Sequence, residues 1–441
     1  MPFSDEDFLG IYQVEGLAYQ YWRTTALMRS LGKGCGIVLD AKGEWKYWGS
    51  KDLFELIKSI DERTDSSPFE TSLVGVWFSE EKSQHENSQK TLTNNAIGTI
   101  YNLDKIEIPD FFAEMGLEIE QGFTPNFIPV LFDLGNFLTA HQFMANAFEK
   151  RNGVSLEVFI GTIWALSNTT ALLGPTPEEE KEDKKALPTS LMNLIQRGYK
   201  VVDFNIEEMG ERLLPAIKIF LPNSKFSSDD VACALDKLTF TPNMQNDVSL
   251  WSGGPRSVII PYNSQAAILD FQGIPSLLFT LFCMIAHDST KRGSVFEETF
   301  RLALKNRGYN VIHGELKQSK KLMRELDAGV RIGNKLILFE CVSIERPLDY
   351  EIGRPVTFAN RQARLEKKIS QVLSLADFIT KHSKGNNFDF SWAEEIVSLV
   401  VTPSIEWAWG KSDELWLSDG TPRMLSASEA ISFLERHTPN N

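Results

Sequence analysis

Apolar and polar positions alternate with several different periods between Gly293 and Pro403, and each period predicts one element. A spacing of three to four residues is typical of an amphipathic helix, whereas a spacing of two or a short apolar run is typical of a strand. The predicted elements are, in order, a helix over 294–307, strands over 309–314, 323–333 and 335–343, a helix over 360–382 and a strand over 395–403. This α-β-β-β-α-β order predicts an α/β domain with a mixed sheet.

The first 173 residues combine helix and strand signals. The apolar spacing predicts a helix over 16–31, a hairpin within 36–49 that turns near 41–43, and a strand over 71–78. From Pro109 onward the spacing becomes helical. We therefore expect an α+β region that is largely helical toward its end.

The middle of the chain begins with GPTPEEEKEDKKALPT, residues 174–189, whose three prolines and charge run predict a linker. A helix is then expected to end at Gly198, which suits the left-handed position before a strand, and a capped helix is expected to begin at Ser228-Asp229. Helical patterns continue to about Asp288. The resulting division is an N-terminal α+β and helical domain of 1–173, a linker of 174–189, a mostly helical region of 190–290, an α/β domain of 291–404, and a Trp-rich extension of 405–441 that packs on that domain.

Composition agrees with a multidomain globular protein that contains no disulfide framework. The chain has 441 residues, of which 42% are hydrophobic and 24% charged, and its four cysteines form no CxxC pair. The acidic N-terminus, MPFSDEDFLG, does not resemble a signal peptide. The most apolar stretch, Ile274 to Ala286, contains Pro275 and is shorter than the ~20 residues of a membrane span, so we expect a buried helix there. We expect a reduced, cytoplasmic protein with no membrane partner.

Charge is distributed unevenly along the chain, whose net charge is −14. Residues 291–384 contain 19 Lys and Arg against 11 Asp and Glu, a net charge of +8, and the remainder contains 26 against 48, a net charge of −22. A module that faces phosphates, carried by an acidic body, would have this pattern, although a solvated surface with clustered charges would also have it.

The turn between the second and third strands of the α/β domain brings two carboxylates together. If Gly333-Asn334 is a two-residue turn, Asp327 lies directly opposite Glu340, and Val342 lies opposite Glu325. Directly opposed like charges are destabilising, so either a divalent cation or a raised pKa should neutralise them. The alternative is a register slip or a bulge that lets each carboxylate reach solvent.

These residues, together with their neighbours, resemble the PD-(D/E)XK nuclease superfamily, which has the restriction-endonuclease-like fold. The motifs that carry the resemblance are Gly293-x-x-Phe296-Glu297, Arg307-Gly308-Tyr309-x-Val311, Glu325-Leu326-Asp327-Ala328 and Phe339-Glu340-Cys341-x-Ser343. The resemblance covers about a quarter of the chain, from Gly293 to Pro403. It implies that Asp327 and Glu340 bind Mg²⁺ or Mn²⁺, that the backbone carbonyl of Cys341 is a further ligand, and that Glu297 completes or orients the metal site. Such a metal would activate water and stabilise charge on a scissile phosphate.

The superfamily motif ends in a lysine, and this chain has Val342 at that position. Valine cannot hold a water molecule or offset negative charge, so either another residue supplies the cation or catalysis has been lost. Candidate substitutes are Arg331 on the second strand and Arg364, Lys367 and Lys368 on the following helix, where Arg364 and Lys368 share a face. Each of these residues is also compatible with a phosphate contact or a solvated surface.

The leading hypothesis is a Mg²⁺-dependent endonuclease that acts on nucleic acid, with DNA favoured over RNA. The resemblance further implies a role in bacterial restriction or phage defence, with a protein partner or a homodimer formed through the acidic N-terminal region. The alternatives are a catalytically degenerate nuclease-fold protein that binds nucleic acid or acts as a scaffold, and a toxin-like RNA nuclease. Three tryptophans, Trp407, Trp409 and Trp416, could stack on bases but are more typical of residues that seal a domain edge.

Overall fold

A computed structural model describes residues 5–66, 76–77, 95–102, 124–171, 194–247, 257–263, 265–274, 277–278, 292–344, 350, 353–406 and 414–438. The chain forms two compact units. One unit combines Met1–Ser67 with Ser289–Asn441, and the other consists of Pro68–Asp288. The division by sequence pattern differs, because it placed residues 1–67 in a domain of 1–173. The predicted linker, 174–189, lies outside the described residues.

The unit of residues 68–288 contains two antiparallel three-stranded sheets and several helices. The strands of the first sheet are β3 (Val76–Trp77), β4 (Asn95–Tyr101) and β5 (Phe127–Asp133), in the order β3-β5-β4. Those of the second sheet are β6 (Tyr199–Asp203), β7 (Ile259–Pro261) and β8 (Ala266–Asp270), in the order β6-β8-β7. The helices are α6 (Leu134–His141), η2 (Gln142–Met144), α7 (Ala145–Asn152), α8 (Leu156–Ala171), α10 (Ile206–Phe220), α11 (Ser228–Leu238) and η4 (Pro242–Asp247).

The helical sequence pattern predicted only part of the secondary structure of this unit. The expectation of helix from Pro109 to Leu173 is wrong for β5, whose sequence FIPVLFD has five successive buried residues and therefore lacks the alternation of a half-exposed strand. The expectation of a mostly helical region over 190–290 missed the short strands β7 and β8. The strand after Gly198 is confirmed as β6, and Gly198 has a φ of 69°.

Other expectations for this unit fall partly on residues that are not described. The capped helix is confirmed as α11, although its N-cap is Ser227, which forms a capping box with Asp230. Most of the expected strand over 71–78 and most of the apolar stretch Ile274 to Ala286 lie outside the described residues. Among the residues that are described, no helix is long and apolar enough to cross a membrane.

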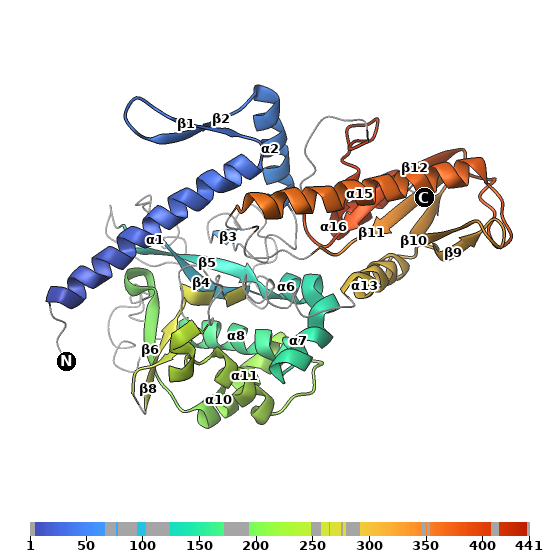
Figure 1. Ribbon diagram of the computed structural model, residues 1–441. Coiled ribbons are helices and arrows are strands. Elements are labelled where there is room, and N and C mark those ends of the chain that lie inside the picture. Colours follow the sequence, from blue (N-terminus) through green and yellow to red (C-terminus); the bar gives the residue numbers. More distant parts are fainter. Residues whose placement is uncertain are drawn as a thin grey trace. The chain divides into compact units, whose positions relative to one another are not determined.

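The N-terminal part of the other unit is a helical pair joined by a hairpin (Figure 1). Its elements are α1 (Asp5–Gly32), β1 (Gly36–Leu39), β2 (Trp45–Trp48) and α2 (Lys51–Asp65), so the predicted helix and hairpin are confirmed. Nε of Arg63 in α2 lies 2.7 Å from Oε1 of Glu429 in the C-terminal helix. This ion pair joins the two ends of the chain within one unit.

The C-terminal part has the predicted α-β-β-β-α-β order. Its elements are α13 (Arg292–Asn306), β9 (Val311–Lys317), β10 (Met323–Ile332), β11 (Lys335–Cys341), α15 (Pro355–Lys381), β12 (Glu395–Thr402), β13 (Met424–Ser426) and α16 (Ala427–His437). The five strands form a mixed sheet in the order β13-β12-β11-β10-β9, in which β9, β10 and β11 are antiparallel neighbours and β11, β12 and β13 are parallel neighbours.

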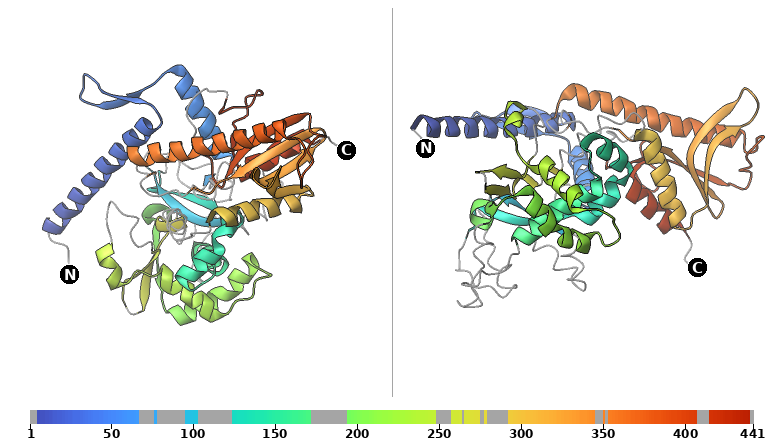
Figure 2. Two further views of the ribbon diagram at one scale, coloured as in Figure 1. Left: turned by 45° about the vertical axis from the view of Figure 1, so that its right-hand side comes forward. Right: turned by 90° about the horizontal axis from the view of Figure 1, so that it is seen from below.

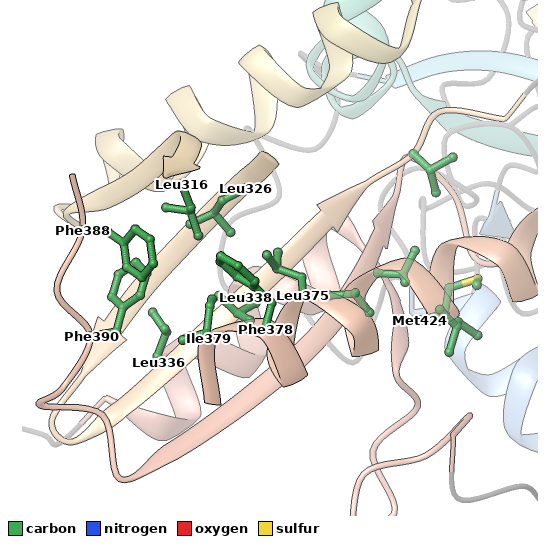
Figure 3. Packing of buried hydrophobic residues seen from close by; sticks show 14 of the residues in the cluster. Leu316, Leu326, Leu336, Leu338, Leu375, Phe378, Ile379, Phe388, Phe390 and Met424 are labelled. Atoms are coloured by element: carbon green, nitrogen blue, oxygen red, sulfur yellow. The ribbon is translucent and has the colours of Figure 1, made fainter. Parts of the chain in front are cut away.

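The side chains of β11 point alternately to the two faces of this sheet. Helix α13 packs on one face and α15 on the other (Figure 2). Phe339 faces α13, where its ring meets that of Phe300 edge-on. Leu336 and Leu338 face α15 and pack in one buried cluster with Leu375 and other residues of that helix (Figure 3). Side chains of even number on β11 therefore point to α15, and Glu340 continues this row.

The extension after β12 contributes the fifth strand, β13, and α16. Trp407 and Trp409 lie outside the described residues. Trp416 forms an isolated bridge with Pro422 and lines a small cavity with Leu56 and Ile60 of α2. Its indole therefore lies at an edge between the N-terminal and C-terminal parts of one unit.

Candidate active site

The hairpin of β10 and β11 has the register that the sequence predicts. Pairing runs from Ile332 opposite Lys335 to Ala328 opposite Phe339, around a turn in which Gly333 has a φ of 59°. Asp327 and Glu340 are the next positions at the end of the hairpin away from the turn. The local turn chemistry thus brings the two carboxylates to the same end of two neighbouring strands.

A β-bulge changes the pairing on the other side of Asp327. Leu326 pairs with Gly314 of β9 and Gly329 pairs with Ile312, so two residues of β10 oppose one residue of β9. Bulges re-aim the side chains beside them and are frequent next to active sites. One oxygen of Asp327, Oδ2, accepts a hydrogen bond of 2.8 Å from the backbone N–H of Cys341. The bulge and this bond together fix the direction of the carboxylate.

The predicted carboxylates line one cavity of about 650 Å³. Glu297 of α13, Asp327 of β10 and Glu340 of β11 are on its wall, and Lys367 and Lys368 of α15 line it as well. Glu325 of β10 lines it too, so the structure brings together four acidic residues that are up to 43 positions apart in the chain. The wall also contains groups that the sequence did not single out, namely Arg324, Ser370, Gln371 and Ser374.

The electrostatics of Asp327 reflect this crowding. Burial, and after it the nearby charge of Glu340, raise the pKa of its carboxyl group from 3.8 to about 7, while the hydrogen bond from Cys341 opposes the shift. Glu297 also raises this pKa, and Lys368 lowers it. Near neutral pH, Asp327 is therefore divided between its charged and neutral forms, which is the expected result for a buried acid beside other acids.

Two cations already neutralise the other carboxylates. Nζ of Lys368 donates a hydrogen bond of 2.6 Å to Oε1 of Glu340. Arg301 is bonded to Glu297 one helical turn away and also donates a hydrogen bond of 3.1 Å to the backbone oxygen of Asp327. The i,i+4 spacing of Glu297 and Arg301 is a sequence signal that would have identified this pair.

The remaining basic candidates are not all at the cavity. Arg331 lies over the ring of Trp392, 4.3 Å from its centroid, and its Nε donates to the backbone oxygen of Gly333. The expectation that Arg331 reaches the carboxylates fails because it lies four positions from Asp327 along β10, a distance of about 13 Å, although the two share a face. Arg364 is exposed and does not line the cavity, because α15 passes the cavity from Lys367 onward.

Val342 lies in the hydrophobic cluster that α15 covers, and only 8% of it is exposed. The expected pairing of Val342 with Glu325 is not found, because β11 ends at Cys341 and its pairing with β10 ends at Ala328 opposite Phe339. The N–H of Val342 instead donates to the backbone oxygen of Val401. Continued parallel pairing with β12 thus draws the chain away from β10 at this point.

A hard divalent cation such as Mg²⁺ requires oxygen ligands. In the described part of the chain, no group of three or more His, Cys, Asp and Glu side chains is arranged to hold a metal ion. The chemistry of the donors nevertheless suits Mg²⁺, because carboxylate and backbone oxygens are its protein ligands, and Asp327, Glu340 and the carbonyl of Cys341 supply them. A cation bound there would relieve the repulsion that raises the pKa of Asp327 and would replace the bond between Glu340 and Lys368.

Comparison of the chain with protein-family models, with curated proteins and with solved structures found no match.

Proposed function

We propose that this protein is a metal-dependent nuclease in which Lys368 supplies the cation that Val342 cannot. The observation that carries the proposal is the 2.6 Å bond between Nζ of Lys368 and Oε1 of Glu340 in a cavity that Asp327 and Glu297 also line. In the PD-(D/E)XK superfamily, which the motifs resemble, a lysine next to the metal ligands serves this purpose. Here the lysine comes from the helix that covers the same face of the sheet.

The roles of the residues follow from charge and position. Asp327 and Glu340, with the carbonyl of Cys341, would hold Mg²⁺ or Mn²⁺, which supplies Lewis-acid stabilisation of phosphate charge when it is bound. Lys368, displaced from Glu340 by that cation, would offset negative charge on the phosphate and orient the attacking water. Glu297, which Arg301 positions, would orient the metal ligands.

The cationic wall suits a polyanionic substrate. Arg324 and Lys367 line the cavity beside the carboxylates, and basic side chains at such a place attract phosphates that the acids would repel. The net charge of +8 over residues 291–384 agrees with this assignment. We propose nucleic acid as the substrate, with DNA favoured over RNA, and a cytoplasmic role in restriction or phage defence.

The test is cleavage by the purified full-length chain. Supercoiled plasmid, linear duplex DNA and RNA are incubated with Mg²⁺ or Mn²⁺, and Glu340→Ala is compared with Glu298→Gln, which changes an exposed neighbour of Glu297. We expect cleavage by the natural chain and by Glu298→Gln, and loss of cleavage in Glu340→Ala. Cleavage that persists in both Glu340→Ala and Asp327→Ala would refute the assignment of this cavity.

A second candidate is a nuclease-fold protein that binds nucleic acid without cleaving it. The observation that favours it is that Lys368 and Arg301 already neutralise Glu340 and Glu297, and that no ready metal cluster is present among the described residues. This candidate predicts that Glu340→Ala leaves nucleic-acid affinity unchanged and that no variant cleaves. Metal-dependent cleavage by the natural chain would exclude it.

A further inference from the structure

The hairpin of β1 and β2 exposes three large aromatic side chains. Trp45 is 54% exposed, Tyr47 58% and Trp48 62%. All four residues of β2 are exposed, and within the described part of the chain the hairpin forms a sheet of two strands (Figure 1). Proteins usually bury such side chains, so a cluster of exposed aromatic residues indicates a binding surface.

Trp48 is held in a defined position by its cross-strand neighbour. It pairs with Gly36, and a Cβ atom at Gly36 would come within 2.3 Å of Cε2 of the indole. The absence of a side chain at Gly36 therefore lets the indole lie across the strand. Alternation along β2 turns this ring to the side opposite Trp45 and Tyr47, so Trp48 is exposed outside the cavity that those two residues line.

Trp45 and Tyr47 point to the same side of β2 and line a cavity of about 520 Å³ with residues of α1. Arg23 of α1 and Lys46 of β2 line this cavity too. Lys46 is bonded to Asp40 at 2.6 Å, and its side chain is 58% exposed. Aromatic rings and cations thus meet in one hollow of the surface.

Charge distinguishes this surface from most of the chain. From Arg23 to Lys51 there are six Lys and Arg against two Asp and Glu, a net charge of +4, whereas the whole chain has a net charge of −14. The local charge is complementary to a polyanion and opposite in sign to most other parts of the same protein. A second copy of this acidic chain would find little complementarity there.

We propose that the cavity beside the hairpin binds single-stranded nucleic acid, with bases stacked on Trp45 and Tyr47 and phosphates bound by Arg23 and Lys46. Stacking on aromatic side chains requires unpaired bases, because bases in a duplex are already stacked on one another. A phosphate oxygen would replace Asp40 as the partner of Lys46. The inference extends the proposed nuclease function, since it names the form of the polymer that the chain holds outside the acidic cavity.

The test measures the binding of a fluorescein-labelled oligothymidylate of about 20 nucleotides by anisotropy, in the presence of EDTA so that no metal-dependent cleavage occurs. Tyr47→Ala should weaken binding at least about fivefold, Tyr47→Phe should retain most of the affinity, and the double variant Trp45→Ala/Tyr47→Ala should weaken binding more than Tyr47→Ala. Lys46→Ala should lower the slope of log K against log salt by about 0.7. The matched control is Trp48→Ala, which removes an exposed aromatic side chain of the same strand that does not line the cavity.

Equal affinity of the Trp45 and Tyr47 variants and the natural chain would overturn the inference, and so would an equal loss in Trp48→Ala. A change in sedimentation without a change in oligonucleotide affinity would overturn it as well, because it would identify a contact between copies of the chain. The measurement is separate from the nuclease proposal: aromatic variants that bind normally in a chain that cleaves refute only this inference, and variants that lose binding in a chain that never cleaves refute only the nuclease.

Discussion

Nζ of Lys368 lies 2.6 Å from Oε1 of Glu340, so the middle of α15 is bonded to the end of β11. The side chains of Glu340 and Val342 point to the face of the sheet that α15 covers, and the lysine reaches that face from the helix. Lys368 thus brings its charge to the cavity from the helix, whereas Val342 lies in the hydrophobic cluster and does not line the cavity.

Lys368→Met should lower metal-dependent cleavage on the order of 10² to 10³, because removal of one charge-stabilising group has this effect in other enzymes. Adding Val342→Lys should restore part of the rate, since residue 342 shares a face with Glu340. Initial rates on plasmid measure both effects, and Lys381→Met, an exposed change near the end of the same helix, is the control. A folded double variant that cleaves as slowly as Lys368→Met would contradict the prediction that a lysine at position 342 can replace Lys368.

Asp327→Asn should increase the free energy of unfolding at pH 8 by about 2 kcal/mol in the presence of EDTA. Burial raises the pKa of Asp327 to about 7, so the folded state holds a proton that the unfolded state releases above pH 4. The natural chain therefore loses stability as the pH rises from about 4 to 7, and asparagine, which can still accept the bond from Cys341, does not. Urea unfolding at pH 5.5 and pH 8 should show the larger gain at pH 8.

Mg²⁺ provides a related test of the same residue. A metal that binds only the folded state stabilises it by mass action, so millimolar Mg²⁺ should raise the unfolding midpoint of the natural chain and leave that of Asp327→Asn unchanged. An equal response of both proteins would place any metal elsewhere.

Arg361→Met should cost about 3 to 5 kcal/mol of stability, because it leaves the carboxylate of Glu406 buried without its partner. The two side chains are 6% and 2% exposed, and the guanidinium also lies 4.7 Å from the centroid of the Tyr350 ring. The double variant Arg361→Met/Glu406→Met should recover most of the loss. Denaturant unfolding measures this, and Glu55→Gln, which breaks an exposed pair with Lys51, should have no measurable effect.

Lys367→Ala should weaken binding of duplex DNA in EDTA and lower the slope of log K against log salt by about 0.9, as expected for one lost phosphate contact. Arg364→Ala should change this slope less, because Arg364 does not line the cavity. Anisotropy titrations at several salt concentrations compare the two variants. A larger effect of Arg364 would mean that the substrate follows the exposed surface of α15 instead of the cavity.

Turns, strand register and helix ends could be predicted from the sequence, because each depends on residues that are close together in the chain. The turn at Gly333-Asn334 set the register of β10 and β11, and through it the approach of Asp327 to Glu340. Gly198 and Gly308 end helices with positive φ, as their positions before strands predicted. Such signals are readable because one turn or one period of apolar residues lies within a few positions of the chain.

Which distant residues come into contact depends on the packing of the whole unit. Arg331, Arg364, Lys367 and Lys368 were equivalent as candidates in the sequence; the position of α15 along the sheet places Lys367 and Lys368 on the cavity wall and bonds Lys368 to Glu340. The grouping of residues 1–67 with 289–441 and the burial of Arg361 with Glu406 were likewise absent from the local pattern. Helix position and strand order result from many weak packing contacts between segments far apart in the chain, so they cannot be predicted from any single stretch of sequence.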